Sequence, residues 1–201
     1  KRLVEPFVGS GAVFMGASYD SYLLCDSNPD LIHLFNYLKF DAQRLMGHVD
    51  SLFTTANNAE LQYYILRAEF NQTQDLFRKA ALFVYLNRHG FNGLCRYNSK
   101  GGFNVPFGRY DSPTPPLKEM EVFAQKAALA TFMCQSFEDT FELLQPGDVV
   151  YCDPPYVSLS ATASFTTYGK AGFGNASQIL LTEKAIQAQA QGYQVVISNH
   201  D

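Results

Sequence analysis

The residues best suited to chemistry are Asp153-Pro154-Pro155-Tyr156, which directly follow the apolar run Val149–Cys152. That run is typical of a buried strand, and open α/β sheets bind ligands just beyond the carboxyl ends of their strands. Two successive prolines fix the backbone and remove two N–H donors, which leaves a stiff group of oxygen acceptors beside an aromatic ring. Such a group can hold a planar amino group through both of its hydrogens. The plain alternative is a strand that ends in a proline-rich turn with a capping Asp.

A glycine turn near the start of the chain is the second feature that suits a ligand. A short strand pattern, Arg2–Pro6, leads into Phe7-Val8-Gly9-Ser10-Gly11, and a helix of small residues begins at Ala12. Glycines let the backbone approach a ligand at a helix N-terminus. The turn lacks the full G-x-G-x-x-G spacing and a phosphate-loop lysine, so a pyrophosphate site is only weakly supported.

An acid follows the next predicted strand, Tyr22–Cys25, and this acid is Asp26. A carboxylate at that tip can bind a ribose through its hydroxyls. The alternative is that Asp26 only caps the helix that starts after Ser27-Asn28-Pro29.

The elements that position these residues alternate between strand and helix, with one interruption. Four helical patterns follow one another without a strand, over Pro29–Lys39, Gln43–Phe53, Ala59–Phe70 and Leu76–Arg88. The alternation resumes after residue 128 with strand patterns that end near Cys134, Cys152 and Ser198. We therefore expect an α/β domain made of residues 1–40 and 128–201, and an inserted subdomain made of residues 41–127.

Residues 88–110 differ in charge from the rest of the chain. They carry four bases and no acid, whereas the whole chain has 15 Lys and Arg against 19 Asp and Glu. Aromatic and amide side chains alternate with the bases, and Gly101-Gly102 predicts the turn of a hairpin. This mixture suits phosphate contact and the reading of base edges. The alternative is an ordinary exposed hairpin with a solvated charged face.

Composition also excludes some classes of protein. No apolar run is long enough for a membrane span, and the four His and four Cys residues share no metal-ligand spacing, so we expect neither membrane nor metal. A sheet that ended at the last predicted strand would expose a backbone edge, so we expect the chain to be a fragment.

Three motifs in this order resemble an S-adenosylmethionine-dependent amino-methyltransferase: Glu5 to Gly11, then Asp26, then Asp153-Pro154-Pro155-Tyr156. The segments from Leu86 to Tyr110, from Val150 to Ala163 and from Ile197 to Asp201 extend the likeness over essentially the whole chain. Together they resemble the bacterial DNA adenine methylase (Dam) family, which methylates adenine N6 in GATC. The family's N-terminal segment, with a Trp, two glycines and a Lys before the first strand, is absent here.

The resemblance implies a Rossmann-like methyltransferase sheet, truncated at both ends, with an inserted helical and β-hairpin DNA-recognition subdomain. It implies that S-adenosylmethionine is the cofactor, that duplex DNA is the partner and that the target base is flipped. The implied catalytic residues are Asp153, Pro154, Pro155 and Tyr156, with Tyr156 stacked on the base. The implied cofactor residues are Glu5, Pro6, Phe7, Gly9, Gly11, Asp26, Ser136, Phe137 and Asp153. The implied DNA-binding residues are Arg88, Phe91, Asn92, Leu94, Arg96, Asn98, Arg109 and Tyr110.

Within that set, Arg96 is implied to read a guanine edge, and Phe91 and Leu94 to wedge between base pairs unless they only pack the hairpin. Three rival functions stay open. They are methylation of cytosine N4 or an RNA base, a DNA-binding fragment without catalysis, and a nucleotide-dependent dehydrogenase, which leaves the Asp-Pro-Pro-Tyr cluster unexplained. We expect a cytoplasmic monomer.

Overall fold

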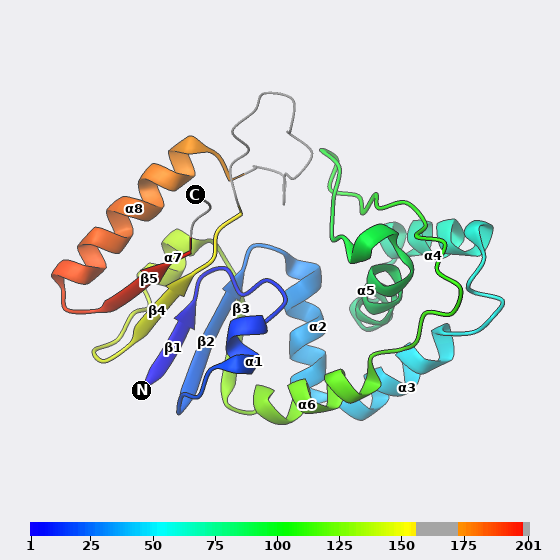
Figure 1. Cartoon of the computed structure of the whole chain (residues 1–201), viewed down its shortest axis with the longest axis horizontal. Coiled ribbons are helices and arrows are strands. Elements are labelled where there is room, and N and C mark those ends of the chain that lie inside the picture. Colours follow the sequence, from blue (N-terminus) through cyan, green and yellow to red (C-terminus); the bar gives the residue numbers. More distant parts are fainter. Residues whose placement is uncertain (156–172, 199–201) are drawn as a thin grey trace. The chain divides into compact units, whose positions relative to one another are not determined.

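The computed structural model describes residues 1–155 and 173–198 of the chain (Figure 1). Tyr156 and the terminal Asn199-His200-Asp201 lie outside these residues. The chain divides into two compact units. Unit 1 contains Lys1–Ile32 and the described residues from Ala128 onward, and unit 2 contains His33–Ala127. The predicted division into residues 1–40 with 128–201 and residues 41–127, and the roles given to the two parts, stay predictions.

A parallel sheet of five strands forms the centre of unit 1, in the order β3-β2-β1-β4-β5. Its strands are β1 (Arg2–Glu5), β2 (Ser21–Asp26), β3 (Ala130–Cys134), β4 (Val149–Cys152) and β5 (Gln194–Ile197). The interior residues of the central strands are apolar because helices cover both faces of the sheet. The predicted α/β fold with a Rossmann-like sheet is confirmed.

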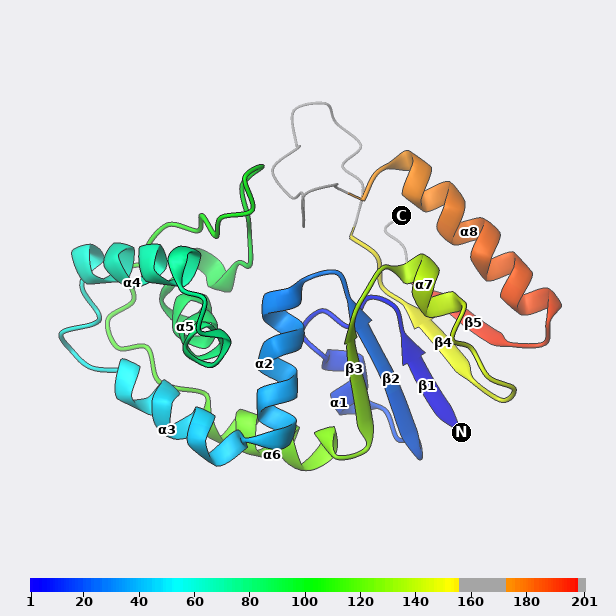
Figure 2. The ribbon, with the colours of Figure 1, turned by 180° about the vertical axis from the view of Figure 1, so that it is seen from behind.

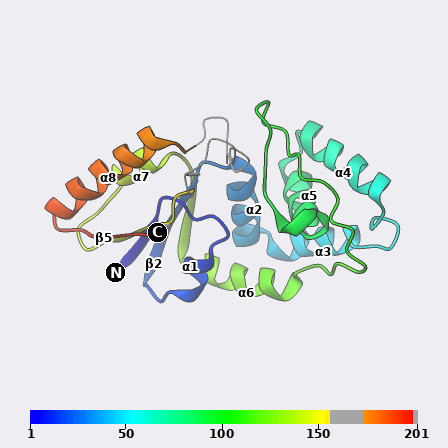
Figure 3. The same ribbon diagram turned by 45° about the horizontal axis from the view of Figure 1, so that its top comes forward.

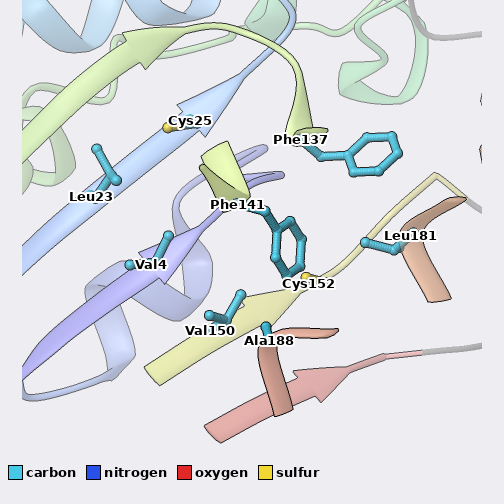
Figure 4. Close-up of a cluster of buried hydrophobic side chains, with 9 residues drawn as sticks. All are labelled: Val4, Leu23, Cys25, Phe137, Phe141, Val150, Cys152, Leu181 and Ala188. Atoms are coloured by element: carbon cyan, nitrogen blue, oxygen red, sulfur yellow. The ribbon is translucent and has the colours of Figure 1, made fainter. Parts of the chain in front are cut away.

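Side chains alternate between the two faces of each strand, and this alternation separates the helices of unit 1 (Figure 2). Phe14 of α1 (Ala12–Gly16) packs on one face against Tyr22 of β2, with their ring centroids 4.9 Å apart. On the other face, side chains of α7 (Phe137–Phe141) and α8 (Asn175–Ala190) belong to one buried cluster with Leu23 and Cys25 of the same strand (Figure 4). The helices that follow β1 and β4 therefore lie on opposite faces.

Unit 2 is built from consecutive helices, as the uninterrupted helical patterns predicted. They are α2 (Pro29–Phe40), which starts in unit 1, α3 (Ala42–Leu52), α4 (Glu60–Gln72), α5 (Leu76–His89) and α6 (Leu117–Ala127). Helix α5 packs against both α3 and α4, so its residues from Ala80 to Leu86 are all buried (Figure 3). Asp75 caps α5 by accepting hydrogen bonds from the backbone N–H groups of Phe77 and Arg78. No helix in the described part of the chain combines the length and apolar character of a membrane span.

The basic segment folds back on itself, but with less regular pairing than a full hairpin. The predicted turn is present: Asn98 donates its backbone N–H to the Gly102 carbonyl at 2.9 Å, and Tyr97 bridges Phe103. Beyond that bridge only Gly90 and Phe107 pair, and a short 3-10 helix, η1 (Phe91–Gly93), takes the place of the first strand. Asn92 adopts a φ of 53° there, which is incompatible with an extended strand.

A buried ion pair fixes the start of β1 to the start of β4. Arg2 Nη2 lies 2.6 Å from Asp148 Oδ2, and Arg2 Nε donates to Asp148 Oδ1 at 3.0 Å. The same carboxylate accepts the Gln145 backbone N–H at 2.8 Å. The side chains of Arg2 and Asp148 are only 21 % and 4 % exposed. Removal of the Asp148 carboxylate would therefore leave a largely buried guanidinium group without its main partner.

We therefore expect Asp148→Ala to lower the free energy of unfolding by about 2 kcal/mol in urea denaturation. Glu142→Ala is the matched control, because Glu142 pairs with Lys184 but its side chain is 70 % exposed. Its loss should cost less than about 1 kcal/mol. Equal losses in the two variants would contradict a structural role for the Arg2–Asp148 pair.

Candidate functional site

The carboxyl ends of β1 and β4 are neighbours, and they carry the acids that the sequence singled out. Val4 pairs with Val150, so Glu5 stands level with Tyr151 and Asp153 follows just beyond. The chain leaves β1 and β4 toward opposite faces of the sheet. That reversal marks the position where open α/β sheets bind their ligands.

Glu5 is a buried carboxyl group at the end of β1, with only 2 % of its surface exposed. It accepts a hydrogen bond from the backbone N–H of Phe14 in the first turn of α1, so it ties the strand to the helix that follows. Its Oε1 atom is buried and has no hydrogen-bond partner among the described residues. Burial, together with the nearby charge of Asp153, raises the pKa of Glu5 to about 7. An unpartnered buried oxygen marks a place where a ligand donor would be favourable.

Asp153 and the two prolines form the acceptor group that the sequence predicted. Asp153 is exposed, and the Ser198 hydroxyl at the end of β5 donates to its Oδ1 atom. Pro154 is buried, and its carbonyl accepts no hydrogen bond from any of the described residues. Pro155 is partly buried, and Tyr156 lies outside the described residues, so its stacking role stays a prediction.

The glycine turn closes over the tip of β2 through Asp26. Gly9 donates its backbone N–H to Asp26 Oδ2 at 3.1 Å, and Val8 donates to the Cys25 carbonyl at 2.8 Å. Gly9 and Gly11 have φ angles of 49° and 76°, in the region that favours glycine. A Cβ atom added at Gly9 would meet no atom within 4 Å, so open space lies beside the turn.

Asp26 is not the cap of the helix that follows it. Asn28 fills that role, because its side-chain oxygen accepts the Asp30 backbone N–H at 3.0 Å at the start of α2. Asp26 instead accepts the Asn28 and Gly9 N–H groups, and burial still raises the pKa of its carboxyl group. Asp26 therefore does not only cap a helix, because it binds the backbone of the glycine turn.

An aromatic cluster lines the same end of the sheet. Phe7 stacks on Phe137 with ring centroids 5.4 Å apart, and Phe173 meets Phe7 edge-on at 5.7 Å. Pro6 and Phe137 are buried. Ser136 caps α7 by accepting the Asp139 backbone N–H at 3.1 Å, so its hydroxyl already has a structural partner.

The predicted DNA-binding residues all lie in unit 2, on the basic segment and at its two ends. Arg88 and Arg109 are held loosely: Arg88 Nε donates to the Thr114 carbonyl at 3.3 Å, and Arg109 lies 3.4 Å from the exposed Glu60. The Tyr110 hydroxyl accepts the Asn92 backbone N–H at 2.9 Å, which joins the two sides of the segment.

Two more residues of this set are already engaged in shaping the segment. The Asn98 side-chain oxygen closes the turn by accepting the Lys100 and Gly102 N–H groups at 2.9 and 3.0 Å. Arg96 is partly buried and donates from Nε to Asn104 Oδ1 at 2.8 Å. By contrast, Phe91 and Leu94 are 48 % and 38 % exposed, so these apolar side chains are not buried in hairpin packing.

Sequence reasoning missed two partners of the predicted residues, Ser198 beside Asp153 and Asn104 beside Arg96. Ser198 had one available signal, since it follows a predicted parallel strand and the ends of such strands meet at one edge. The sequence signal for Asn104 was weaker: it lies across the predicted turn from Arg96. No cluster of His, Cys, Asp and Glu that could hold a metal ion occurs among residues 1–155 and 173–198.

Comparison with known proteins gives consistent matches. Residues 1–201 match the family described as D12 class N6 adenine-specific DNA methyltransferase. A DNA adenine methylase of Vibrio cholerae (strain O395) is 48 % identical over 202 residues, which cover all of this chain and 73 % of the relative. DNA adenine methylases of Salmonella typhimurium (strain LT2) and Escherichia coli (strain K12) are 49 % and 48 % identical over 199 residues, 99 % of this chain and 72 % of each relative.

The raised pKa of Glu5 predicts that the free energy of unfolding depends on pH. Its ordinary pKa of 4.5 applies to the unfolded chain, so between pH 4.5 and about 7 the folded state binds more protons. The free energy of unfolding should therefore fall as pH rises through this window, by up to about 3 kcal/mol. Glu5→Gln removes the ionisation and keeps an acceptor for Phe14, so it should be more stable than the wild type at pH 8 and similar to it at pH 5.

Urea denaturation at pH 5, 6, 7 and 8 measures this difference. Asp153→Asn provides a second check, because loss of the neighbouring charge should move the Glu5 transition to lower pH. Identical pH dependence in the wild type and Glu5→Gln would show that the Glu5 carboxyl group is not held neutral by burial.

Proposed function

The chain belongs to the D12 class of N6 adenine-specific DNA methyltransferases, and we propose that it methylates adenine in GATC after rotating that base out of the duplex. As a member of this family it is an enzyme that acts on adenine in DNA. This sets aside the rivals that methylate cytosine N4 or RNA, the dehydrogenase and the DNA-binding fragment without catalysis. We propose a cytoplasmic monomer as the working form.

Membership of a methyltransferase family implies S-adenosylmethionine as the methyl donor, and the residues at the end of the sheet suit that molecule. The Asp26 carboxylate stands at the tip of β2, where a ribose would meet it. The open space beside Gly9 allows close approach to the backbone, and the unpartnered Glu5 Oε1 can accept a hydrogen bond from a cationic ligand. When bound, the donor would supply an electrophilic methyl group.

The remaining cofactor contacts follow from the same neighbourhood. Phe7 is only partly buried, so together with the buried Pro6 and Phe137 behind it, it offers an apolar position against which a flat adenine can pack. Gly11 is the N-cap residue of α1, and the N-terminal end of a helix favours a carboxylate. Ser136 borders this surface, and Asp153 lies on the side of β4.

The proposed chemistry at Asp153 is positioning. The lone pair of an adenine amino group is delocalised into the ring, so the nitrogen is a poor nucleophile. If the Asp153 carboxylate and the Pro154 carbonyl each accept one N6 hydrogen, the lone pair is turned out of the ring plane toward the methyl group. The Ser198 hydroxyl supports this geometry, because it donates a hydrogen bond to Oδ1 of Asp153 and so helps to orient the carboxylate.

For DNA, the acid-free segment of unit 2 supplies the contacts that we propose. Arg88 and Arg109 bind phosphates, and Asn92, Asn98 and Tyr110 are polar contacts. The exposed Phe91 and Leu94 can wedge between base pairs, which favours extrusion of a neighbouring base. Arg96 reads a guanine in the major groove through two parallel hydrogen bonds.

The observation that best supports this proposal is the acceptor group at the ends of β1 and β4. It is tested by measuring transfer of a labelled methyl group from S-adenosylmethionine to a duplex with one GATC. A duplex of equal composition with GTAC in its place is the control. We expect label only in the GATC duplex, and a rise in fluorescence when 2-aminopurine replaces the target adenine. Equal labelling of the two duplexes would overturn the proposed site, and no labelling of either would overturn the activity of this chain.

We expect Asp153→Ala to abolish methyl transfer, with a loss of at least about 1000-fold in turnover, since it removes one of the two N6 acceptors. DNA affinity, measured by fluorescence anisotropy, should stay within a few fold, because the proposed DNA contacts lie on unit 2. Ser198→Ala should give a partial loss, because Asp153 would remain but be held less firmly. Near-normal turnover in Asp153→Ala would rule out its catalytic role.

Asp26→Ala should weaken S-adenosylmethionine binding by about 10-fold or more in calorimetry, because a carboxylate bound to two hydroxyls contributes about 1.5–3 kcal/mol per bond. Asp50→Ala is the control, since Asp50 is exposed on α3 in unit 2. Thermal denaturation of both variants checks that the Gly9 turn still folds. Unchanged affinity in Asp26→Ala would remove this residue from the proposed cofactor site.

A further inference from the structure

Residues 103–105 of the basic segment are fixed to α4 by side chains that form hydrogen bonds with their backbone. Asn71 accepts the Phe103 N–H at 2.8 Å and donates to the Phe103 carbonyl at 3.1 Å. The Val105 carbonyl accepts the Tyr63 hydroxyl at 3.0 Å and Arg67 Nη1 at 2.8 Å. Phe103 and Val105 are both buried, at 2 % and 0 % exposed. The segment is therefore held to α4 at both of these positions.

Asn104 lies between these two buried residues and is itself only partly buried. It is joined to Arg96 by three hydrogen bonds, of which one uses the Asn104 side chain and two use its backbone. The Asn104 backbone N–H donates to the Arg96 carbonyl at 3.1 Å. Arg96 Nε donates to Asn104 Oδ1 at 2.8 Å, and Arg96 Nη2 donates to the Asn104 carbonyl at 3.3 Å. Arg96 has no other hydrogen bond or ion pair among the described residues.

This pairing determines which edge of the guanidinium group stays available. A guanidinium group has five N–H donors, and Asn104 occupies the one on Nε and one on Nη2. The edge formed by Nη1 and the outer hydrogen of Nη2 remains. Two parallel donors on that edge match the O6 and N7 acceptors that guanine presents in the major groove.

We infer that Asn104 is a specificity-determining positioning residue, which holds the Arg96 guanidinium group so that its Nη1–Nη2 edge faces the base. The inference rests on the proposed role of Arg96 in reading a guanine. A free Arg side chain loses considerable rotamer freedom on binding, and Asn104 removes part of that loss beforehand. Asn104 touches the base only through Arg96.

The neutral amide at position 104 also suits this role. An acid at that position would form an ion pair with Arg96 and compete with the base for its donors. It would also place a negative charge beside phosphates in a segment, residues 88–110, that contains no Asp or Glu. The Asn104 amide orients the guanidinium group and leaves its positive charge unpaired by any described residue.

The test compares Asn104→Ala, Arg96→Ala and the double variant in methyl transfer. The substrates are the GATC duplex and a set in which each base pair of the site is replaced in turn, and kcat/KM is measured for each. Arg96→Ala should relax discrimination at one base pair by about 10-fold to 100-fold. Asn104→Ala should relax discrimination at the same base pair by about 5-fold to 10-fold. In the double variant, discrimination should equal that of Arg96→Ala alone, because Asn104 acts through Arg96.

Asn71→Ala is the matched control, because it removes the two bonds that hold Phe103 and does not touch Arg96. It should lower the melting temperature and slow methylation of every duplex alike. If Asn104→Ala gives that uniform pattern, its role is structural and the inference is overturned. The same holds if its effect persists undiminished in the Arg96→Ala background.

Failure of the proposed function has a different signature. If Arg96→Ala itself leaves site preference unchanged, Arg96 does not read a base and the inference falls with that role. If Arg96→Ala relaxes one base pair and Asn104→Ala relaxes none, only the positioning role of Asn104 is overturned.

Discussion

The parallel pairing of β1 with β4 is the constraint on which unit 1 depends. Val4 opposite Val150 brings Glu5 and Asp153 to the same edge of the sheet, although they are far apart in sequence. The buried Arg2–Asp148 pair fixes the other end of the same two strands. Since the helices after β1 and β4 lie on opposite faces, the binding position between their carboxyl ends follows from the topology.

Two carboxyl groups at this edge of the sheet lie in different environments. Glu5 is buried, and its pKa of about 7 keeps a large fraction of it protonated near neutral pH. Asp153 is exposed and hydrogen-bonded by Ser198. A site with one buried, partly neutral carboxyl group and one exposed acceptor carries less negative charge than two carboxylates side by side. Burial of the Glu5 carboxyl group costs free energy, and it occurs at the position where a ligand would bind. Strongly perturbed carboxyl groups of this kind are typical of functional sites.

In unit 2, a glycine-rich segment is held in place without a continuous ladder of strand hydrogen bonds. Side chains of α4 take over the role of a neighbouring strand by bonding the backbone of Phe103 and Val105. Asn98 closes the turn, and Tyr110 joins the two sides. The side chains of Phe91 and Leu94 are exposed, and they take no part in the hydrogen bonds that hold the segment to α4.

The sequence by itself determined the α/β class, the run of consecutive helices and the residue types of the candidate site, because periodicity and turn chemistry are properties of adjacent residues. Asp153, Asp26 and the Gly9 turn were identified in this way. Only the tertiary structure decided the strand order, the capping of α2 by Asn28 rather than Asp26, the raised pKa of Glu5, and the pairing of Ser198 with Asp153 and Asn104 with Arg96. The strand order, the raised pKa of Glu5 and the Ser198–Asp153 pair depend on which distant segments meet and on how much water they exclude, and local sequence patterns do not specify either.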